Sequence, residues 1–171
     1  MLHLDVGALQ RYLISCICYT KSDWDGFNHS IMKELVVGDN SCNESDFILL
    51  DLSGCVSLKE VKVGNNCLKN VETLRMTELR NLESVVFGND CATKRGYSTD
   101  DGGDCNRHFY LKNCPKLKSL KIGCESFMDY SVIEIENVDA LEVIEMGDLN
   151  EDSFNFNFAS LELKSILIHS V

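Results

Sequence analysis

The sequence predicts a mainly β repeat protein, a solenoid of about five coils of about 24 residues, with two short strands per coil and little helix. Three observations predict it. A seven-residue pattern that ends in glycine recurs along the chain. A second apolar segment precedes each later copy of that pattern. The spacing from the second segment to the next copy is constant at eight residues, as from Leu50 to Leu58.

The first pattern has apolar residues at its first, fourth and sixth places and glycine at its seventh. Alternation of apolar and polar residues over such a short run is typical of a strand with one buried side. A further copy opens the chain at residues 1–7. The five internal copies are Met32–Gly38, Leu58–Gly64, Leu82–Gly88, Leu117–Gly123 and Leu141–Gly147.

The second pattern also alternates and predicts another strand in each coil. Because a single unit of this size cannot bury its own apolar side, we expect neighbouring coils to cover one another. Variation in length falls in the connection that follows each glycine, so we expect the insertions at one edge. The second segments are Leu50-x-Leu52-x-x-Cys55, Leu74-x-Met76-x-x-Leu79, Phe109-x-Leu111-x-x-Cys114, Ile133-x-Ile135-x-x-Val138 and Leu161-x-Leu163-x-x-Ile166.

These patterns carry a family resemblance. The run from Phe47 to Leu58 resembles the L-x-x-L-x-L-x-x-N/C segment of leucine-rich-repeat proteins in its cysteine-containing form. Residues 117–123 with Ser126-Phe127 beyond them resemble the BspA-type repeats of microbial eukaryotes and bacteria. The resemblance implies a solenoid, classed by convention as α/β, whose concave strand face engages another protein.

We expect a single leucine-rich-repeat domain. Its N-terminal part is predicted to be an irregular extra coil or cap that contains Trp24 and Phe27, and the segment Leu13-x-x-Cys16-x-Cys18 fits either a helix or a repeat strand. Neither end shows a recognisable cap motif, so a place within a longer solenoid stays open. The expected ranges are 1–171 for the domain, 1–31 for the irregular part, 32–168 for the regular repeats and 91–105 for an inserted loop.

The nine cysteines are expected to be mostly structural thiols. Cys55 and Cys114 share a column with leucine, where a buried cysteine acts as a small hydrophobic residue. Cys67 and Cys91 share a turn column with serine in adjacent coils, so a disulfide between them is the alternative. Unpaired thiols favour a reducing, cytoplasmic location, and a Cys67–Cys91 bridge would favour the cell surface or secretion.

Composition limits the partners. The formal net charge of −11 argues against nucleic acid and favours a protein partner with a basic surface. No apolar run approaches the roughly 20 residues that span a bilayer, so no membrane insertion is expected. The candidate partner-binding residues are the strand residues Arg75, Tyr110, Lys112, Glu134 and Glu136 and the loop residues Lys94, Arg95 and Tyr97.

The function predicted from these observations is a non-catalytic protein–protein interaction module that presents its curved face and one edge of loops. The alternative is an extracellular or cell-surface BspA-like adhesion protein. No catalytic motif or metal-ligand spacing occurs, so no catalytic residue, metal or cofactor is expected. A hydrolase using Cys105 and His108 is a third reading, and calcium binding by Asp100, Asp101 and Asp104 is the alternative for the inserted loop.

Overall fold

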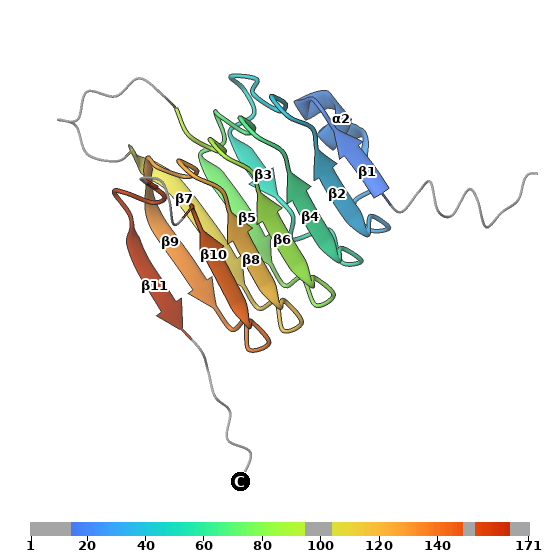
Figure 1. The fold of residues 1–171 in the computed structure, drawn as a ribbon. Helices are drawn as coiled ribbons and strands as arrows, with labels where there is room; N and C mark the ends of the chain where they lie inside the picture. The colour runs from blue at the N-terminus through green and yellow to red at the C-terminus, as the bar shows by residue number, and fades with distance from the viewer. Residues whose placement is uncertain (1–14, 95–103, 149–152, 165–171) are drawn as a thin grey trace, which may run out of the picture.

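The computed structural model describes residues 15–94, 104–148 and 153–164. This part of the chain forms eleven strands and one helix of six residues. The strands make two parallel sheets, one of six strands and one of five (Figure 1). The predicted mainly β character with little helix is therefore confirmed.

Five of the six strands of the first sheet come from the seven-residue pattern, and β1 lies outside its copies. Each pairs in parallel with the strand of the next unit, and the register keeps the pattern aligned, as in the pairs Leu35–Val61 and Val61–Val85. Cys16 and Cys18 occupy the same columns one unit earlier, opposite Leu35 and Val37. In sheet order the strands are β1 (Ser15–Cys18), β2 (Glu34–Val37), β4 (Glu60–Val63), β6 (Ser84–Phe87), β8 (Ser119–Ile122) and β10 (Val143–Met146).

The strands of the second sheet come from the other apolar segment. From β2 onward the chain alternates between the sheets, so neighbours in one sheet are separated along the sequence by a strand of the other, whereas helix α2 lies between β1 and β2. The register again aligns the repeat columns, with Leu74 opposite Phe109 and Phe109 opposite Ile133. In sequence order the strands are β3 (Leu49–Asp51), β5 (Thr73–Thr77), β7 (Asp104–Lys112), β9 (Tyr130–Glu136) and β11 (Ser160–Lys164).

The inward side chains of both sheets form one hydrophobic core. From the unit that begins at Met32 to the unit that begins at Leu117, every first, fourth and sixth residue of the glycine pattern is buried. Fully burying one such aliphatic side chain contributes roughly 1.5–3 kcal/mol. The core thus depends on each unit being covered by the next.

The repeat glycines form a row at the end of the first sheet. The amide of Gly88 donates to the carbonyl of Val63 at 2.8 Å, and that of Gly123 donates to Phe87 at 2.9 Å. A Cβ atom on Gly88 would lie 2.8 Å from the backbone of Gly64, which is closer than real contacts allow. The pattern requires glycine because successive turns approach one another here.

Polar side chains tie these turns together. The side-chain oxygens of Asp39, Asn65 and Asn89, which follow the glycines, each accept a hydrogen bond from the backbone amide one unit further along the chain. Each turn also holds two non-glycine residues at positive φ, as at Asn66 (φ 55°) and Leu68 (φ 60°). Asparagine tolerates this left-handed conformation better than most residues.

The N-terminal end of the described sheets is closed by helix α2 (Lys21–Gly26). The hydroxyl of Thr20 accepts from the amide of Asp23, whose carboxylate accepts from the amide of Thr20, so a capping box starts the helix. Trp24 is buried and stacks on His29 with ring centroids 4.1 Å apart. Residues 15–18 form a strand rather than the helical alternative.

The other end of the sheets is open. In β10, the inward-column residues Ile144 and Met146 are 43% and 39% exposed. In β11, Leu161 and Leu163 are 53% and 59% exposed, although the same columns are buried in every earlier unit. Within the described part of the chain, no strand lies beyond β10 or β11 in either sheet.

A candidate binding face on the second sheet

The outward side chains of the second sheet form rows that cross the strands. One row follows the register from Asp51 through Arg75 and Tyr110 to Glu134 and Glu162. A second row lies beside it. We call these residues together the outer face of the second sheet, and its second row is Thr77, Lys112, Glu136 and Lys164.

Tyr110 lies at the centre of this face. The guanidinium carbon of Arg75 lies 5.8 Å from the centroid of its ring, and Nζ of Lys112 lies 5.6 Å from it. Its hydroxyl shares a hydrogen bond of 2.9 Å with Nδ1 of His108, the neighbouring outward residue of β7. Two cations and a histidine therefore hold the only ring of the row in place, and cation–aromatic contacts of this kind are stabilising.

An ion pair stands at the N-terminal side of the face. Nη1 of Arg75 lies 3.1 Å from Oδ2 of Asp51 across the β3–β5 pair. Partial burial opposes ionisation of Asp51, but hydrogen bonds from Ser53 and Arg75 outweigh it and lower the pKa of this carboxyl. Arg75 is thus oriented by Asp51 before any partner arrives.

Lys112 joins the acidic strand β9 to the centre of the face. Its ammonium donates to Glu134 and lies 3.2 Å from Oε2 of Glu136. The hydrogen bond to Glu134 raises the pKa of Lys112. Lys164 likewise pairs with Glu162 at 2.6 Å. The acidic C-terminal third therefore has more compensating lysine on this face than its sequence alone indicates.

The loop candidates lie apart from the strand candidates. Nζ of Lys94 lies 3.9 Å from Oε1 of Glu72, the residue before β5. Arg95 and Tyr97 lie outside the described residues, as does most of the inserted loop 91–105 with Asp100 and Asp101. The strand candidates come together on one face, and the structure does not bring Lys94 onto it.

Cys105 lies in β7, but the structure does not describe its side chain. His108, its partner in the hydrolase reading, uses Nδ1 for the bond with Tyr110. His108 was not among the residues predicted to lie on the outer face. The inward position of Phe109 could have shown it, because neighbours in a strand point to opposite sides.

The predicted roles of the cysteines can be compared with their surroundings. Cys55 and Cys114 are buried in the core, as predicted. Burial raises the pKa of Cys55 to about 12 and that of Cys114 to about 11. The eight cysteines whose side chains the structure describes are free thiols.

A buried ion pair between β7 and the segment before β9 was not predicted from the sequence. Nη1 of Arg107 lies 2.5 Å from Oδ2 of Asp129, and Nη2 donates to the carbonyls of Lys69 and Val71. The Arg107 side chain is fully buried and lies over the ring of Tyr130. Arg107 stands two places before Phe109, so the alternation of a strand could have predicted that this charged residue lies on the inward side of β7.

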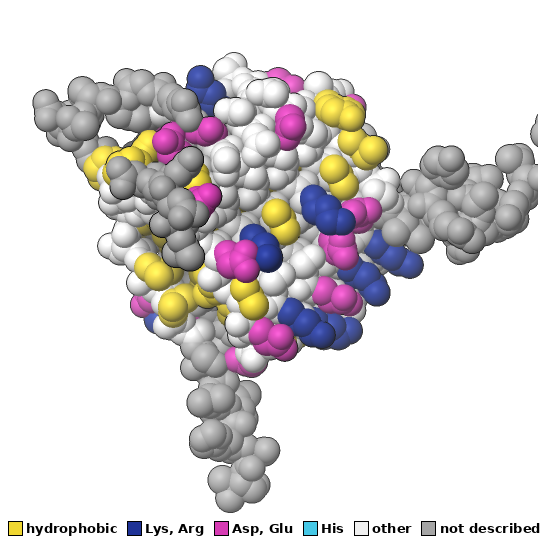
Figure 2. Space-filling view, in the orientation of Figure 1, with side chains coloured by type: hydrophobic (Ala, Val, Ile, Leu, Met, Phe, Trp, Pro, Cys, Tyr) yellow, Lys and Arg dark blue, Asp and Glu magenta, His cyan; other side chains and the backbone are white. Residues whose placement is uncertain are grey.

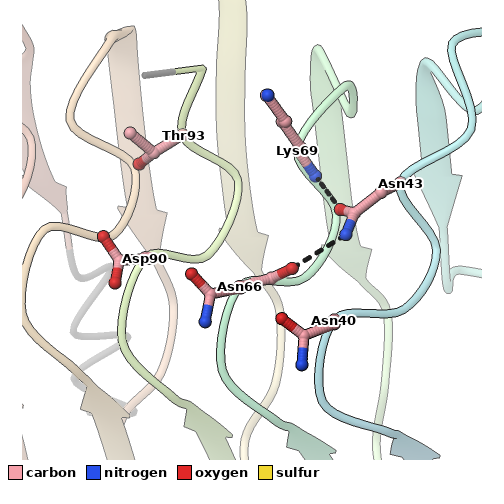
Figure 3. Close-up of a pocket in the computed structure, with 6 residues that line it drawn as sticks. All are labelled: Asn40, Asn43, Asn66, Lys69, Asp90 and Thr93. Carbon is pink, nitrogen blue, oxygen red and sulfur yellow. Dashed lines mark hydrogen bonds between the residues drawn. The ribbon is translucent and has the colours of Figure 1, made fainter.

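A second candidate site is an open groove of about 190 Å³ along the turns that follow the first sheet (Figure 3). Asn43 crosses it, donating to the carbonyl of Asn66 at 2.8 Å and accepting from the amide of Lys69 at 2.8 Å. These bonds link neighbouring turns, so they account for the position of the Asn43 side chain without a bound ligand. The lining residues are Asn40, Asn43, Asn66, Lys69, Asp90 and Thr93.

The first sheet presents a different surface. Figure 2, in the orientation of Figure 1, shows basic and acidic side chains side by side over its strands. Lys62 lies 2.8 Å from Glu34 and 2.7 Å from Glu60, and Lys121 lies 2.8 Å from Glu145. None of these described pairs includes an aromatic side chain, so they differ from the arrangement around Tyr110. A substitution on this face can therefore serve as a control for substitutions on the outer face of the second sheet.

Searches of protein-family models, of curated proteins and of solved structures found no match. Among the described residues, no group of three or more His, Cys, Asp or Glu side chains could hold a metal ion. No described helix is long and apolar enough to cross a membrane.

Proposed function

We propose that this chain is a leucine-rich-repeat-like solenoid that binds another protein through the outer face of its second sheet, without catalysing a reaction. Support for the solenoid comes from the alternation of the chain between two parallel sheets and from the constant repeat register. Parallel strands that return one unit further along each time are what stacked repeats produce.

The observation that carries the binding proposal is the set of contacts around the Tyr110 side chain. Tyrosine and arginine are enriched among the residues that dominate protein interfaces. Here Arg75 and Lys112 flank the ring, and Asp51 and Glu134 orient those two cations. A side chain that is already ordered loses less conformational freedom on binding, which favours affinity.

The partner that we propose is a protein with a basic surface. The formal net charge of −11 attracts such a surface over long range. Glu136 and Glu162 lie on the C-terminal side of the two rows, where Glu136 shares Lys112 with Glu134 and Glu162 pairs with Lys164. Acidic side chains at the rim would steer the partner, while Tyr110 would be the anchor.

We further propose that the protein works in the cytoplasm, because buried unpaired thiols fit a reducing compartment. The cell-surface alternative predicts a Cys67–Cys91 bridge in protein isolated from its source. Each of these thiols donates to the carbonyl of a repeat glycine, namely Cys67 to Gly38 and Cys91 to Gly64, both at 2.9 Å.

Affinity capture from the source cells tests the binding proposal. The immobilised wild type would be compared with Tyr110→Ala and with Lys62→Ala, a matched change at an ion-paired residue of the first sheet. We expect a protein that wild type and Lys62→Ala retain and Tyr110→Ala loses, and its binding should weaken as salt increases. Equal retention by all three proteins would contradict the proposal.

A further inference from the structure

Two buried thiols are in contact where the N-terminal part meets the first regular unit. Cys18 ends β1, and Cys42 lies in the turn after β2. Their Sγ atoms are 3.3 Å apart, and each residue is 1% exposed. The amide of Cys42 donates to the carbonyl of Tyr19 at 2.9 Å, so the backbone already holds the two segments together.

We propose that Cys18 and Cys42 are an oxidative modification site, which forms an intramolecular disulfide on reaction with a small-molecule disulfide such as oxidised glutathione. A disulfide bond is about 2.05 Å long, so the sulfur atoms need to approach by only about 1 Å. This inference goes beyond the proposed binding function and does not depend on it.

The two thiols are suited to different steps of the exchange. The hydrogen bond with Cys42 lowers the pKa of Cys18, and the same bond, together with burial, raises the pKa of Cys42. Cys18 is therefore the better nucleophile, because the thiolate is the attacking species.

The reaction balances in two exchanges. Cys18 loses its proton and attacks a sulfur of oxidised glutathione, which forms a mixed disulfide and releases one glutathione, which takes up that proton. Cys42 then loses its proton and attacks Sγ of Cys18, which forms the Cys18–Cys42 bond and releases the second glutathione. Two Sγ–H bonds and one S–S bond break, and the two electrons reduce the glutathione disulfide to two thiols.

Two other pairs of described cysteines are less suited to forming a disulfide. A side-chain interaction between Cys67 and Cys91 likewise lowers the pKa of Cys67 and raises that of Cys91, but each Sγ donates to a glycine carbonyl at 2.9 Å, a closer contact than the 3.3 Å from Sγ of Cys18 to the carbonyl of Thr20. Cys55 and Cys114 occupy the same column two units apart, with Leu79 of the intervening unit between them in the sequence. Two strand spacings of about 4.8 Å separate such residues, beyond the usual span of a disulfide.

The position of Cys18 and Cys42 determines how the oxidant reaches the thiols and how a disulfide between them would affect stability. Reaction requires local opening at the end of the sheets, where α2 has only six residues. The bridge would then close a loop across the 24 positions from Cys18 to Cys42, a loop that contains α2. Closing a loop restricts the unfolded chain, so the oxidised form should resist unfolding better than the reduced form.

The test uses the full chain, equilibrated in buffers of increasing ratio of oxidised to reduced glutathione. Free thiols are then blocked, and proteolytic fragments are mapped by mass spectrometry without reduction. We expect a Cys18–Cys42 linked fragment as the first disulfide to form, and a higher melting temperature that dithiothreitol reverses. Cys55→Ala, at a buried thiol elsewhere in the core, should leave the linked fragment in place.

Two outcomes would overturn the proposal. One is a folded wild type in which both thiols stay reduced, or carry only glutathione, at the highest oxidised ratio. The other is a Cys67–Cys91 fragment that forms at lower ratios than Cys18–Cys42. Because both readings come from the wild type, they do not depend on whether a Cys18→Ala variant folds.

Discussion

The two ends of the described sheets differ in how well their apolar side chains are buried. At the N-terminal end, α2 follows β1 and buries Trp24, which is 6% exposed. At the other end, Leu161 and Leu163 of β11 are 53% and 59% exposed in columns that are buried in earlier units. The comparison teaches that the repeat supplies apolar columns, while burial of those columns depends on a neighbour at each end.

The largest effect is expected from removing the indole at the closed end. Trp24→Ala should lower the free energy of unfolding by about 3 kcal/mol, because it leaves a cavity where a large aromatic side chain was buried. Chemical denaturation of both proteins measures the difference. The matched control is Phe158→Ala at the open end, where the ring is exposed and the change should be within about 0.5 kcal/mol. Equal losses for the two variants would remove the distinction between the ends.

The loss of stability at alkaline pH should test how well the core between the two ends is buried. Burial raises the pKa of Cys55 to about 12, so the folded state holds this proton more tightly than the unfolded state, whose thiol titrates near 8.5. The stability linked to this thiol is therefore complete below about pH 8.5 and is lost as pH rises towards 12. Between neutral pH and about pH 10 we expect a loss of up to about 2 kcal/mol.

The measurement is urea denaturation at both pH values for wild type and Cys55→Val. The variant should lose less stability between the two conditions, because it has no thiol to ionise at this position. If the two proteins lose the same amount, ionisation of Cys55 does not contribute to the alkaline effect.

A smaller effect is expected from the capping box at the closed end. Thr20→Ala removes the hydroxyl that accepts from the amide of Asp23 and should cost about 1 kcal/mol. Thr20→Ser keeps an acceptor at the same place and should retain most of the stability. Thermal unfolding of the three proteins gives the comparison, and a serine variant as unstable as the alanine variant would show that the cap is not the cause.

The smallest effect is expected at the open end. Leu163→Ser should change the free energy of unfolding by no more than about 0.5 kcal/mol, because the leucine is already largely in solvent. Leu111→Ser, in the same inward column of β7, should cost several times more, since Leu111 is fully buried. Similar values for the two serine variants would mean that β11 is covered in solution.

The repeat columns could be predicted from the sequence because strands with one buried side impose a period of two, and because the close approach of successive turns requires glycine, as at Gly88. Leu35, Val61 and Val85 align as the spacing requires. The outward row that contains Arg75 and Tyr110 follows from the same parity. These features depend on neighbours in the sequence and on one repeated register.

Other features could not be predicted because they depend on side chains that meet only after folding. Cys18 and Cys42 are 24 positions apart, and their contact requires both the strand register and the turn geometry. Arg107 is a charge on the inward, buried side of β7, and Asp129 makes its burial tolerable. The position of the Tyr110 ring between Arg75 and Lys112 likewise depends on strand pairing in the second sheet.

The most direct test of the proposed function compares the outer face with the open end as binding surfaces. The dissociation constant of the captured partner would be measured for the wild type, Tyr110→Ala and Leu163→Ala. The account predicts that Tyr110→Ala weakens binding at least about tenfold, or about 1.4 kcal/mol, while Leu163→Ala changes it less than about twofold. A partner whose binding is lost with Leu163→Ala and kept with Tyr110→Ala would contradict the account.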